Sequence, residues 1–316
     1  MKWFYMMHDS VSSLSYKRLD VTQLAAEVDR LPELPQAVVG VMRALEEPDV
    51  DADDLASIIR LDPNLTAQIL RLSNSAAYGL SRRVETVKDA VAILGQNTLK
   101  SLLYTILSHQ ALTQEMPGYA LKAGDLWSHA MTGAFYARHM SKNLHLLGLA
   151  SSAKMDPEVV FTAALLRDIG KIILAAYVGA NYSDIEHYAL KHQVSFQQAE
   201  RHVIGASHTD VGEAIAERWQ LPQSILRTIA YHHTPLNAPK SLNPQDDLVL
   251  ALVHLADGIA SLLGKGVGCD GLMYQIDFSA LNTAGLVLEK EQFERLIAEF
   301  MIIQPQLDDM LSTMKA

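Results

Sequence analysis

The helical spacing of apolar residues along almost the whole chain is the feature that most constrains its fold. After Asp62-Pro63, the residues Leu65, Ile69 and Leu72 recur three to four positions apart, which is the spacing of one helix face. The Asp-Pro pair is typical of a helix start, with aspartate as N-cap and proline in the first turn. No stretch shows the sustained alternation of apolar and polar residues, bounded by hairpin turns, that predicts strands. The sequence therefore predicts an all-α, multi-helix bundle.

Further helices are predicted from the same periodicity and from capping residues. Thr86 is expected to cap a helix that ends at Gly95, since glycine is favoured just past a helix C-terminus. Trp219 is expected to fill the core and not to stack on a ligand. The remaining predicted helices cover residues 22–30, 36–46, 53–61, 97–112, 124–141, 157–177, 181–191, 195–203, 208–218, 222–233, 245–263 and 289–300.

The predicted helices fall into two blocks. A turn-forming cluster at residues 115–118 separates a first block, residues 20–115, from a second block, residues 119–265. Residues 1–19 form an N-terminal extension, and residues 266–316 carry no recognisable motif. The first block contains a single histidine and the second contains most of them. This asymmetry indicates that the first block serves packing or docking and that the second block descends from a catalytic domain.

Charge and cysteine content limit the class of protein. With 26 basic and 36 acidic residues the formal net charge is −10, so neither a nucleic acid nor an anionic membrane is an expected partner. The single cysteine, Cys269, allows no internal disulfide. The first apolar run is too short for a signal peptide, and the longest one, residues 159–178, contains Arg167, Asp168 and Lys171, so it predicts a buried helix. A cytoplasmic protein is expected.

Side chains that can bind a metal are concentrated in the second block. Imidazole and carboxylate together suit iron, manganese, zinc, nickel or cobalt, and a helical bundle can aim side chains from several helices at one point. No pair among them has a local ligand spacing such as His-Glu-x-x-His, so spacing alone is a weak indication. The candidates are His129, Asp168, His208, His232, His233 and Asp257.

Each candidate also has a structural interpretation. A single helical histidine is more often a half-buried core residue than a ligand. The rings of His232 and His233 leave a helix in different directions, so one would be buried and the other exposed. Asp257 would cap a helical turn. On the residues alone these alternatives stay open.

The order of the candidates resembles that of the HD superfamily, whose ligands run His … His-Asp … His … His-His … Asp in expanded members. The segment LLRDIGK at residues 165–171 is similar to the namesake motif, except that Arg167 stands at its histidine. The first block adds a second match. Its segments LPELP (31–35), LRLSNSAAYG (70–79) and AVAILG (90–95) look like the hallmarks of HDOD domains. The resemblance covers about residues 20–265 and implies an N-terminal helical subdomain packed on an HD-type helical subdomain.

The resemblance also implies a ligand arrangement. HD hydrolases split phosphate esters with metal-activated water, often between two ions that share the motif aspartate. In this chain one ion would be held by His129, the motif histidine, Asp168 and Asp257. The other ion would be held by Asp168, His208, His232 and His233.

Arg167 removes one ligand from the first of these sets. A guanidinium keeps its proton and cannot coordinate a metal. Pointing inward, it would neutralise Asp168 and Asp257 in place of the ion; the alternative is that it turns to solvent. We therefore expect the first metal position to be empty or weak and the chain to bind at most one divalent transition metal. Lys171 is a candidate phosphate contact, and a solvated helix lysine is the alternative.

Two functions from different classes follow from the resemblance. The first is a bacterial signal-transduction module with a degenerate site that binds a signalling protein or a small phosphorylated ligand. The second is a mononuclear metal-dependent phosphohydrolase, with Asp168 and Lys171 as catalytic residues. A third interpretation makes the metal structural, holding the histidine helices together. The Gly-Tyr-Pro signature of HD-GYP cyclic-di-GMP phosphodiesterases is missing, because His232-His233 is followed by TPLN at 234–237.

Overall fold

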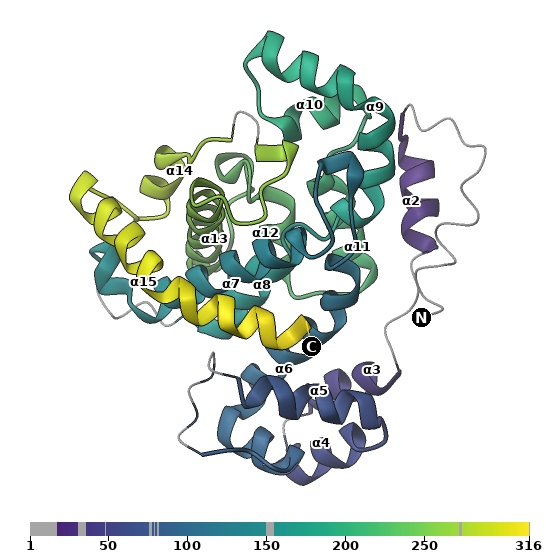
Figure 1. The fold of residues 1–316 in the computed structure, drawn as a ribbon, viewed down its shortest axis with the longest axis vertical. Helices are drawn as coiled ribbons and strands as arrows, with labels where there is room; N and C mark the ends of the chain where they lie inside the picture. Colours follow the sequence, from purple (N-terminus) through teal and green to yellow (C-terminus); the bar gives the residue numbers. More distant parts are fainter. Residues whose placement is uncertain are drawn as a thin grey trace.

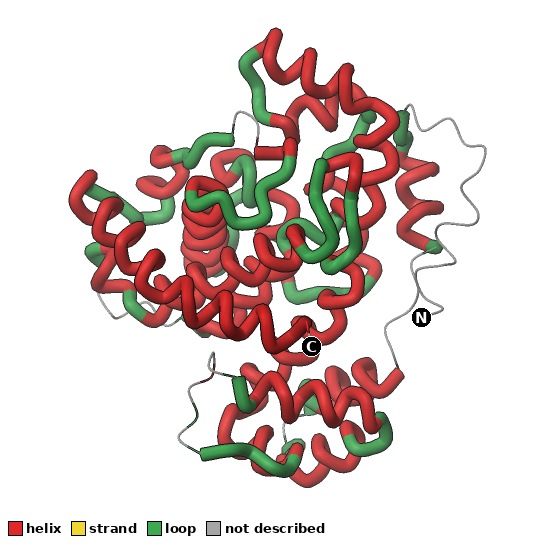
Figure 2. Tube along the Cα trace, viewed as in Figure 1, coloured by secondary structure: helices red, strands yellow, loops and turns green. Residues whose placement is uncertain are grey.

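The computed structural model describes residues 18–30, 36–47, 49–75, 78, 80, 82–149, 155–271 and 274–315. Over these residues the chain is helical, with connecting loops and one isolated bridge between Met116 and Leu121 (Figure 2). The expected all-α fold is confirmed. Most of the predicted extension, the LPELP segment and part of the LRLSNSAAYG segment lie outside the described residues. Within those described, no helix combines the length and apolar character needed to cross a membrane.

A small lobe is formed by α3 (Gln36–Ala44), α4 (Ala52–Ile59), α5 (Pro63–Ser73) and the start of α6 (Val87–Leu112), seen at the bottom of Figure 1. It has its own hydrophobic core. Asp62 caps α5 as expected, since its side chain accepts hydrogen bonds from the backbone N–H groups of Asn64 and Leu65. The Asn74 side chain bonds the backbone of Val84 at both N–H and C=O, at 2.8 Å each. This bond pair closes the loop that follows α5.

Helix α6 changes direction at Gly95, and its residues pack into the cores of both lobes. The backbone of Gly95 has φ +80° and ψ 168°, a conformation that glycine adopts without the strain other residues would feel. The expected helix end at Gly95 is confirmed, and the chain re-enters a helix directly. In that second part Leu99 and Leu103 face the small-lobe core, whereas Leu102 and Leu112 belong to the core of the large lobe.

The large lobe holds the remaining helices around one hydrophobic core. Helix α2 (Val21–Asp29) packs on α11 of this lobe, and α15 (Lys290–Lys315) lies against α7, where the rings of Tyr136 and Phe300 stack at 4.0 Å. The other elements are α7 (Asp125–Lys142), α8 (Pro157–Leu166), α9 (Lys171–His192), α10 (Phe196–Val203), α11 (His208–Arg218), α12 (Gln223–Tyr231), α13 (Pro244–Leu262) and α14 (Phe278–Thr283), with short 3-10 turns η2 (Pro117–Tyr119), η3 (Leu144–Leu147), η4 (Pro235–Asn237) and η5 (Cys269–Gly271).

The sequence prediction was wrong for the helix boundaries around the motif. The helix predicted over residues 157–177 ends at Leu166, and a turn separates it from α9, which runs unbroken where a second break was predicted. The apolar residues on both sides of the turn are buried, and so are Arg167, Asp168 and Ile169 within it, so periodicity does not reveal the break. The turn lies tight against α11, since a Cβ on Gly170 would meet the His208 carbonyl oxygen at 1.9 Å.

Candidate metal centre

All six residues predicted as ligands converge on one point in the large lobe. His129 comes from the second turn of α7 and Asp257 from α13, while Asp168 lies in the turn between α8 and α9. His208 is the first residue of α11, and the pair His232-His233 ends α12. Two groups of ligand atoms each lie within 4.8 Å of one another, and Asp168 belongs to both. The groups are Asp168 with His208, His232 and His233, called here the histidine half, and Asp168 with His129 and Asp257, called the arginine half.

In the histidine half three imidazoles face one carboxylate. The Nε2 atoms of His208 and His232 lie 3.6 and 3.8 Å from Asp168 Oδ1, and His233 Nε2 lies 2.9 Å from His208 Nε2. His232 Nε2 is buried and has no hydrogen-bond partner among the described residues. A buried polar nitrogen without a partner is costly, and a metal ion would satisfy it. These residues fit one divalent transition metal ion.

Hydrogen bonds at Nδ1 orient two of these rings. His208 Nδ1–H donates to Glu200 Oε2 at 2.8 Å, and the backbone N–H of His208 donates to the same oxygen at 3.0 Å. The Tyr119 hydroxyl donates to the other oxygen of Glu200 at 2.7 Å. His232 Nδ1–H donates to the Ile229 carbonyl at 3.1 Å. With Nδ1 committed, Nε2 of each ring presents its lone pair to the centre, as in carboxylate–histidine–metal arrangements.

Burial keeps the imidazoles of His232 and His233 neutral. It lowers the pKa of His232 to about 4 and that of His233 well below its usual value. Burial acts on His208 in the same direction, but the Glu200 carboxylate outweighs it and raises the pKa of His208. A metal ion at His208 Nε2 would therefore compete with the proton of the charged imidazole, and its affinity would fall as the pH falls.

In the arginine half the guanidinium of Arg167 points inward and is fully buried. Its Nε donates to Asp257 Oδ1 at 2.9 Å and lies 3.5 Å from Asp168 Oδ2, and its Nη2 lies 2.8 Å from Asp257 Oδ1. Its Nη1 donates to the Ala164 carbonyl at 2.7 Å. The alternative that Arg167 turns to solvent is wrong.

His129 is held between acceptors in the same half. Its Nε2 bonds Asp257 Oδ1 at 2.9 Å and its Nδ1 bonds the Lys265 carbonyl at 2.8 Å. Both ring nitrogens of His129 are thus engaged by oxygens of the chain.

The two carboxylates of the centre are ionised. Burial alone would raise the pKa of Asp168, but Lys171 and Arg167 hold it well below its usual range. Burial likewise opposes ionisation of Asp257, but Arg167 and the hydrogen bond from His129 hold its pKa well below the usual value. The arginine half is thus neutralised by the chain's own cations.

The third charged side chain of the motif region, Lys171, is buried between two carboxylates. Its Nζ lies 2.8 Å from Asp168 Oδ1 and also pairs with Asp270. Only 2% of the side chain is exposed, so the alternative of a solvated helix lysine is wrong. The cavity at the centre measures about 10 Å³, roughly the space of one water molecule. A contact between Lys171 and a phosphate would need this cavity to widen.

Sequence reasoning missed four residues of the centre. Glu200 orients His208, and Asp270 and Tyr274 come from the C-terminal segment in which no motif was found. Gly133 on α7 gives the guanidinium its room, since a Cβ there would meet Arg167 Nη1 at 2.6 Å. None of the four has a local spacing that links it to the ligands, so no sequence signal was available.

Solved structures with the same fold extend over most of the chain. A putative phosphohydrolase from Shewanella amazonensis matches with a TM-score of 0.66 at 23% identity, covering 92% of this chain and 97% of that one. A putative signal transduction protein from Marinobacter aquaeolei matches with a TM-score of 0.69 at 18% identity, covering 99% of this chain and 65% of that one. At these identities the likeness establishes the fold.

Sequence comparison identifies the family. An uncharacterized protein from Treponema pallidum is 25% identical over 223 residues, which are 70% of this chain and 41% of that protein. The chain therefore spans about two fifths of the length of this curated relative. The model of the HDOD domain matches residues 31–235, more than half of the chain. The hallmark segments, the helical fold and this match agree, and the chain belongs to the HDOD domain family.

Proposed function

We propose that this chain is a signal-transduction module that works by binding a protein partner or a small phosphorylated ligand, on a phosphohydrolase scaffold that has lost one of two metal positions. The observation that carries the proposal is the buried Arg167 guanidinium between Asp257 and Asp168. Hydrolysis by a hydroxide held between two ions requires both positions. The solved relative named as a putative signal transduction protein supports the same role.

The size of the cavity supports a binding role over catalysis at this centre. A phosphate ester needs far more room than the roughly 10 Å³ present, and the charged groups around that cavity are already paired with one another. Lys171 bonds Asp168 and Asp270, and Arg167 bonds Asp257. A substrate would have to break these buried ion pairs before reaching the carboxylate.

One metal ion fits the proposal in a structural role. Asp168, His208, His232 and His233 would hold it, and when bound it would supply Lewis acidity and a cross-link between α11, α12 and the turn before α9. The proposed ion is iron, manganese, zinc, nickel or cobalt. The chain's own contribution is the set of oriented Nε2 atoms and the ionised Asp168.

A second candidate is a mononuclear phosphohydrolase, favoured by the complete donor set of the histidine half. The solved relative named as a putative phosphohydrolase supports it. In that case Asp168 would be the metal ligand that activity cannot lose, and Lys171 the phosphate contact. One metal can still generate a hydroxide.

Phosphoester turnover separates the two candidates. Bis-(p-nitrophenyl) phosphate and p-nitrophenyl phosphate would be offered to the wild-type chain with Mn²⁺, Zn²⁺, Ni²⁺ or Fe²⁺, beside Asp168→Ala. The binding module predicts equal background rates for the two proteins. Turnover by the wild type that disappears in Asp168→Ala would establish the hydrolase instead.

A further inference from the structure

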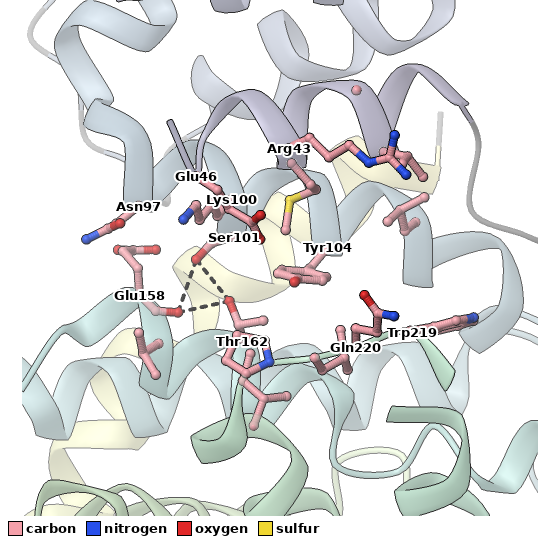
Figure 3. Close-up of a pocket in the computed structure, with 18 of the residues that line it drawn as sticks. Arg43, Glu46, Asn97, Lys100, Ser101, Tyr104, Glu158, Thr162, Trp219 and Gln220 are labelled. Atoms are coloured by element: carbon pink, nitrogen blue, oxygen red, sulfur yellow. Dashed lines mark hydrogen bonds between the residues drawn. The ribbon is translucent and has the colours of Figure 1, made fainter. Parts of the chain in front are cut away.

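A second and much larger cavity lies between the two lobes. Its volume is about 1190 Å³, against about 10 Å³ at the metal centre. Helices α3 and α6 form one side, and α8 with the turn between α11 and α12 forms the other (Figure 3). Pockets of several hundred Å³ and more hold small organic ligands. We call this space the interlobe cleft.

Three helices connect the interlobe cleft to the metal centre. Thr162 of α8 lies in the cleft, and Asp168 follows the C-terminal end of the same helix. Helix α11 runs the opposite way, beginning at His208 and ending at Trp219 in the cleft. Helix α12 starts at the cleft and ends at the histidine pair. A ligand in the cleft therefore contacts the far ends of the helices that hold the metal ligands.

Two cations face the cleft without partners. Arg43 on α3 is exposed and Lys100 on α6 is half-buried, and neither side chain forms an ion pair or hydrogen bond with any residue that the structure describes. Lysine and arginine are the usual phosphate-binding side chains, and charge-assisted bonds to phosphate are among the strong ones. The pair provides the charge for an anionic ligand.

The cleft also offers aromatic surface. Tyr104 lies in its middle, with only 8% of the residue exposed, and the half-buried Trp219 lies in the α11–α12 turn (Figure 3). Trp219 packs on the large-lobe core and lines the cleft as well. Its indole N–H is buried and, among the described residues, donates to nothing. Flat aromatic faces of this kind stack with nucleobases.

Two carboxylates complete the lining. Glu46 and Glu158 both reach the cleft (Figure 3), and one oxygen of Glu158 is buried without a hydrogen-bond partner in the described structure. A carboxylate accepts hydrogen bonds and repels phosphate, so it calls for a donor on the ligand. The exocyclic amino group of a nucleobase is such a donor.

We infer that the interlobe cleft binds a nucleotide whose base carries an amino group. Its phosphates lie on Arg43 and Lys100, its base packs against Trp219, and its amino group donates to a cleft carboxylate. The inference rests on the proposed function, since it names the class of phosphorylated ligand and its site, and it requires no metal ion. It gives the module a ligand site remote from the closed centre, linked to it by α8, α11 and α12.

Tryptophan fluorescence, to which Trp219 contributes beside Trp3 and Trp127, tests the inference in the intact chain. ATP, GTP and inorganic tripolyphosphate would be titrated into metal-loaded and into EDTA-treated protein. We expect saturable changes with ATP or GTP in both preparations and a much weaker response to tripolyphosphate, which lacks a base. The double variant Arg43→Ala/Lys100→Ala should bind at least about tenfold more weakly, since two charge-assisted bonds are lost. Arg60→Ala, an exposed cation outside the cleft, is the matched control and should bind as the wild type does.

Three results would overturn the inference. They are no response to ATP or GTP at millimolar concentration, unchanged affinity in the double variant, or tripolyphosphate binding as tightly as the nucleotides. Circular dichroism of the double variant confirms that it is folded, and both substituted residues lie at the cleft surface. Nucleotide binding is measured with and without EDTA, so its outcome does not depend on whether the proposed metal site is correct.

Discussion

The two halves of the metal centre share Asp168 but neutralise it differently. In the arginine half, Arg167 lies 3.5 Å from Asp168 Oδ2 and 2.8 Å from Asp257 Oδ1, and a permanent side-chain charge stands where the family places an ion. In the histidine half, His232 keeps a buried Nε2 with no partner among the described residues. On the proposed account, Arg167 makes the first half independent of metal, whereas an ion would satisfy the ring nitrogens of the second half.

The hydrogen bonds of the histidines also differ between the two halves. Both nitrogens of His129 are committed to acceptors, Asp257 and the Lys265 carbonyl. His208 and His232 bond acceptors through Nδ1 and keep Nε2 turned to the centre, where His208 Nε2 lies 2.9 Å from His233 Nε2. A histidine held this way is arranged as a ligand, and one held at both nitrogens is engaged by the chain's own oxygens. The comparison teaches that imidazole hydrogen bonding, more than the presence of histidines, indicates which half binds metal.

The largest effect is expected when the arginine half loses its internal cation. Arg167→Ala removes the guanidinium from two ionised, buried carboxylates and leaves Asp168 with Lys171 and Asp257 with His129. Breaking a buried ion pair costs about 3–5 kcal/mol. Urea unfolding followed by circular dichroism measures the loss. Arg60→Ala, an exposed residue, should change the free energy of unfolding by less than about 0.5 kcal/mol. A loss below about 1 kcal/mol in Arg167→Ala would mean that the guanidinium does not replace the ion.

Removal of metal should affect the histidine half alone. At a metal concentration 100 times the dissociation constant, the bound ion contributes about 2.7 kcal/mol. Chelation should therefore lower the melting temperature of the wild type and leave that of His208→Ala unchanged. Equal shifts in the two proteins would contradict the assignment of the ligands.

Glu200 should tune the histidine half without belonging to it. Glu200→Gln keeps the size of the side chain but removes the negative charge that orients His208, so metal affinity should fall about 10–100-fold. Competition with a chromogenic chelator measures this affinity. An unchanged affinity in Glu200→Gln, beside complete loss in His208→Ala, would show that Glu200 is only part of the core.

The smallest effect is expected from Gly133→Ala, which tests the close contact between α7 and Arg167 in the arginine half. A Cβ at Gly133 would meet Arg167 Nη1 at 2.6 Å, so Gly133→Ala should destabilise the wild type by about 1 kcal/mol, the overpacking cost less the gain in helix propensity. In the Arg167→Ala background the obstruction is gone, and the same change should stabilise by about 0.5–1 kcal/mol. A thermal unfolding cycle over the four proteins checks this reversal of sign. Additive effects would argue against the close contact.

The helices could be predicted from the sequence, whereas the hydrogen bonds and ion pairs between side chains of different helices could not. Helical periodicity and the motif order anticipated an all-α fold and six residues that the structure brings together. The direction of Arg167 could not be predicted, because it depends on Asp257, ninety positions away, and on the missing side chain at Gly133. The break between α8 and α9 was not predicted because the apolar residues on both sides of the turn are buried. Tertiary contacts of this kind leave no local pattern.

The roles of Glu200 and Asp270 escaped for the same reason. Glu200 is an ordinary position in a helix until α10 and α11 bring it to His208, and Asp270 follows a stretch without any motif until it meets Lys171. A buried carboxylate is recognised from the residues it pairs with, and the order of residues along the chain does not reveal those pairs.

Metal content tests the central claim most directly. Mass spectrometry of protein purified without a histidine tag would compare the wild type with His208→Ala and Arg167→His. The account predicts close to one transition metal per chain in the wild type, none in His208→Ala, and a second equivalent in Arg167→His, where the missing ligand is restored. Two metals per wild-type chain would contradict the arginine half. A wild type without metal, or a His208→Ala variant that keeps it, would contradict the histidine half.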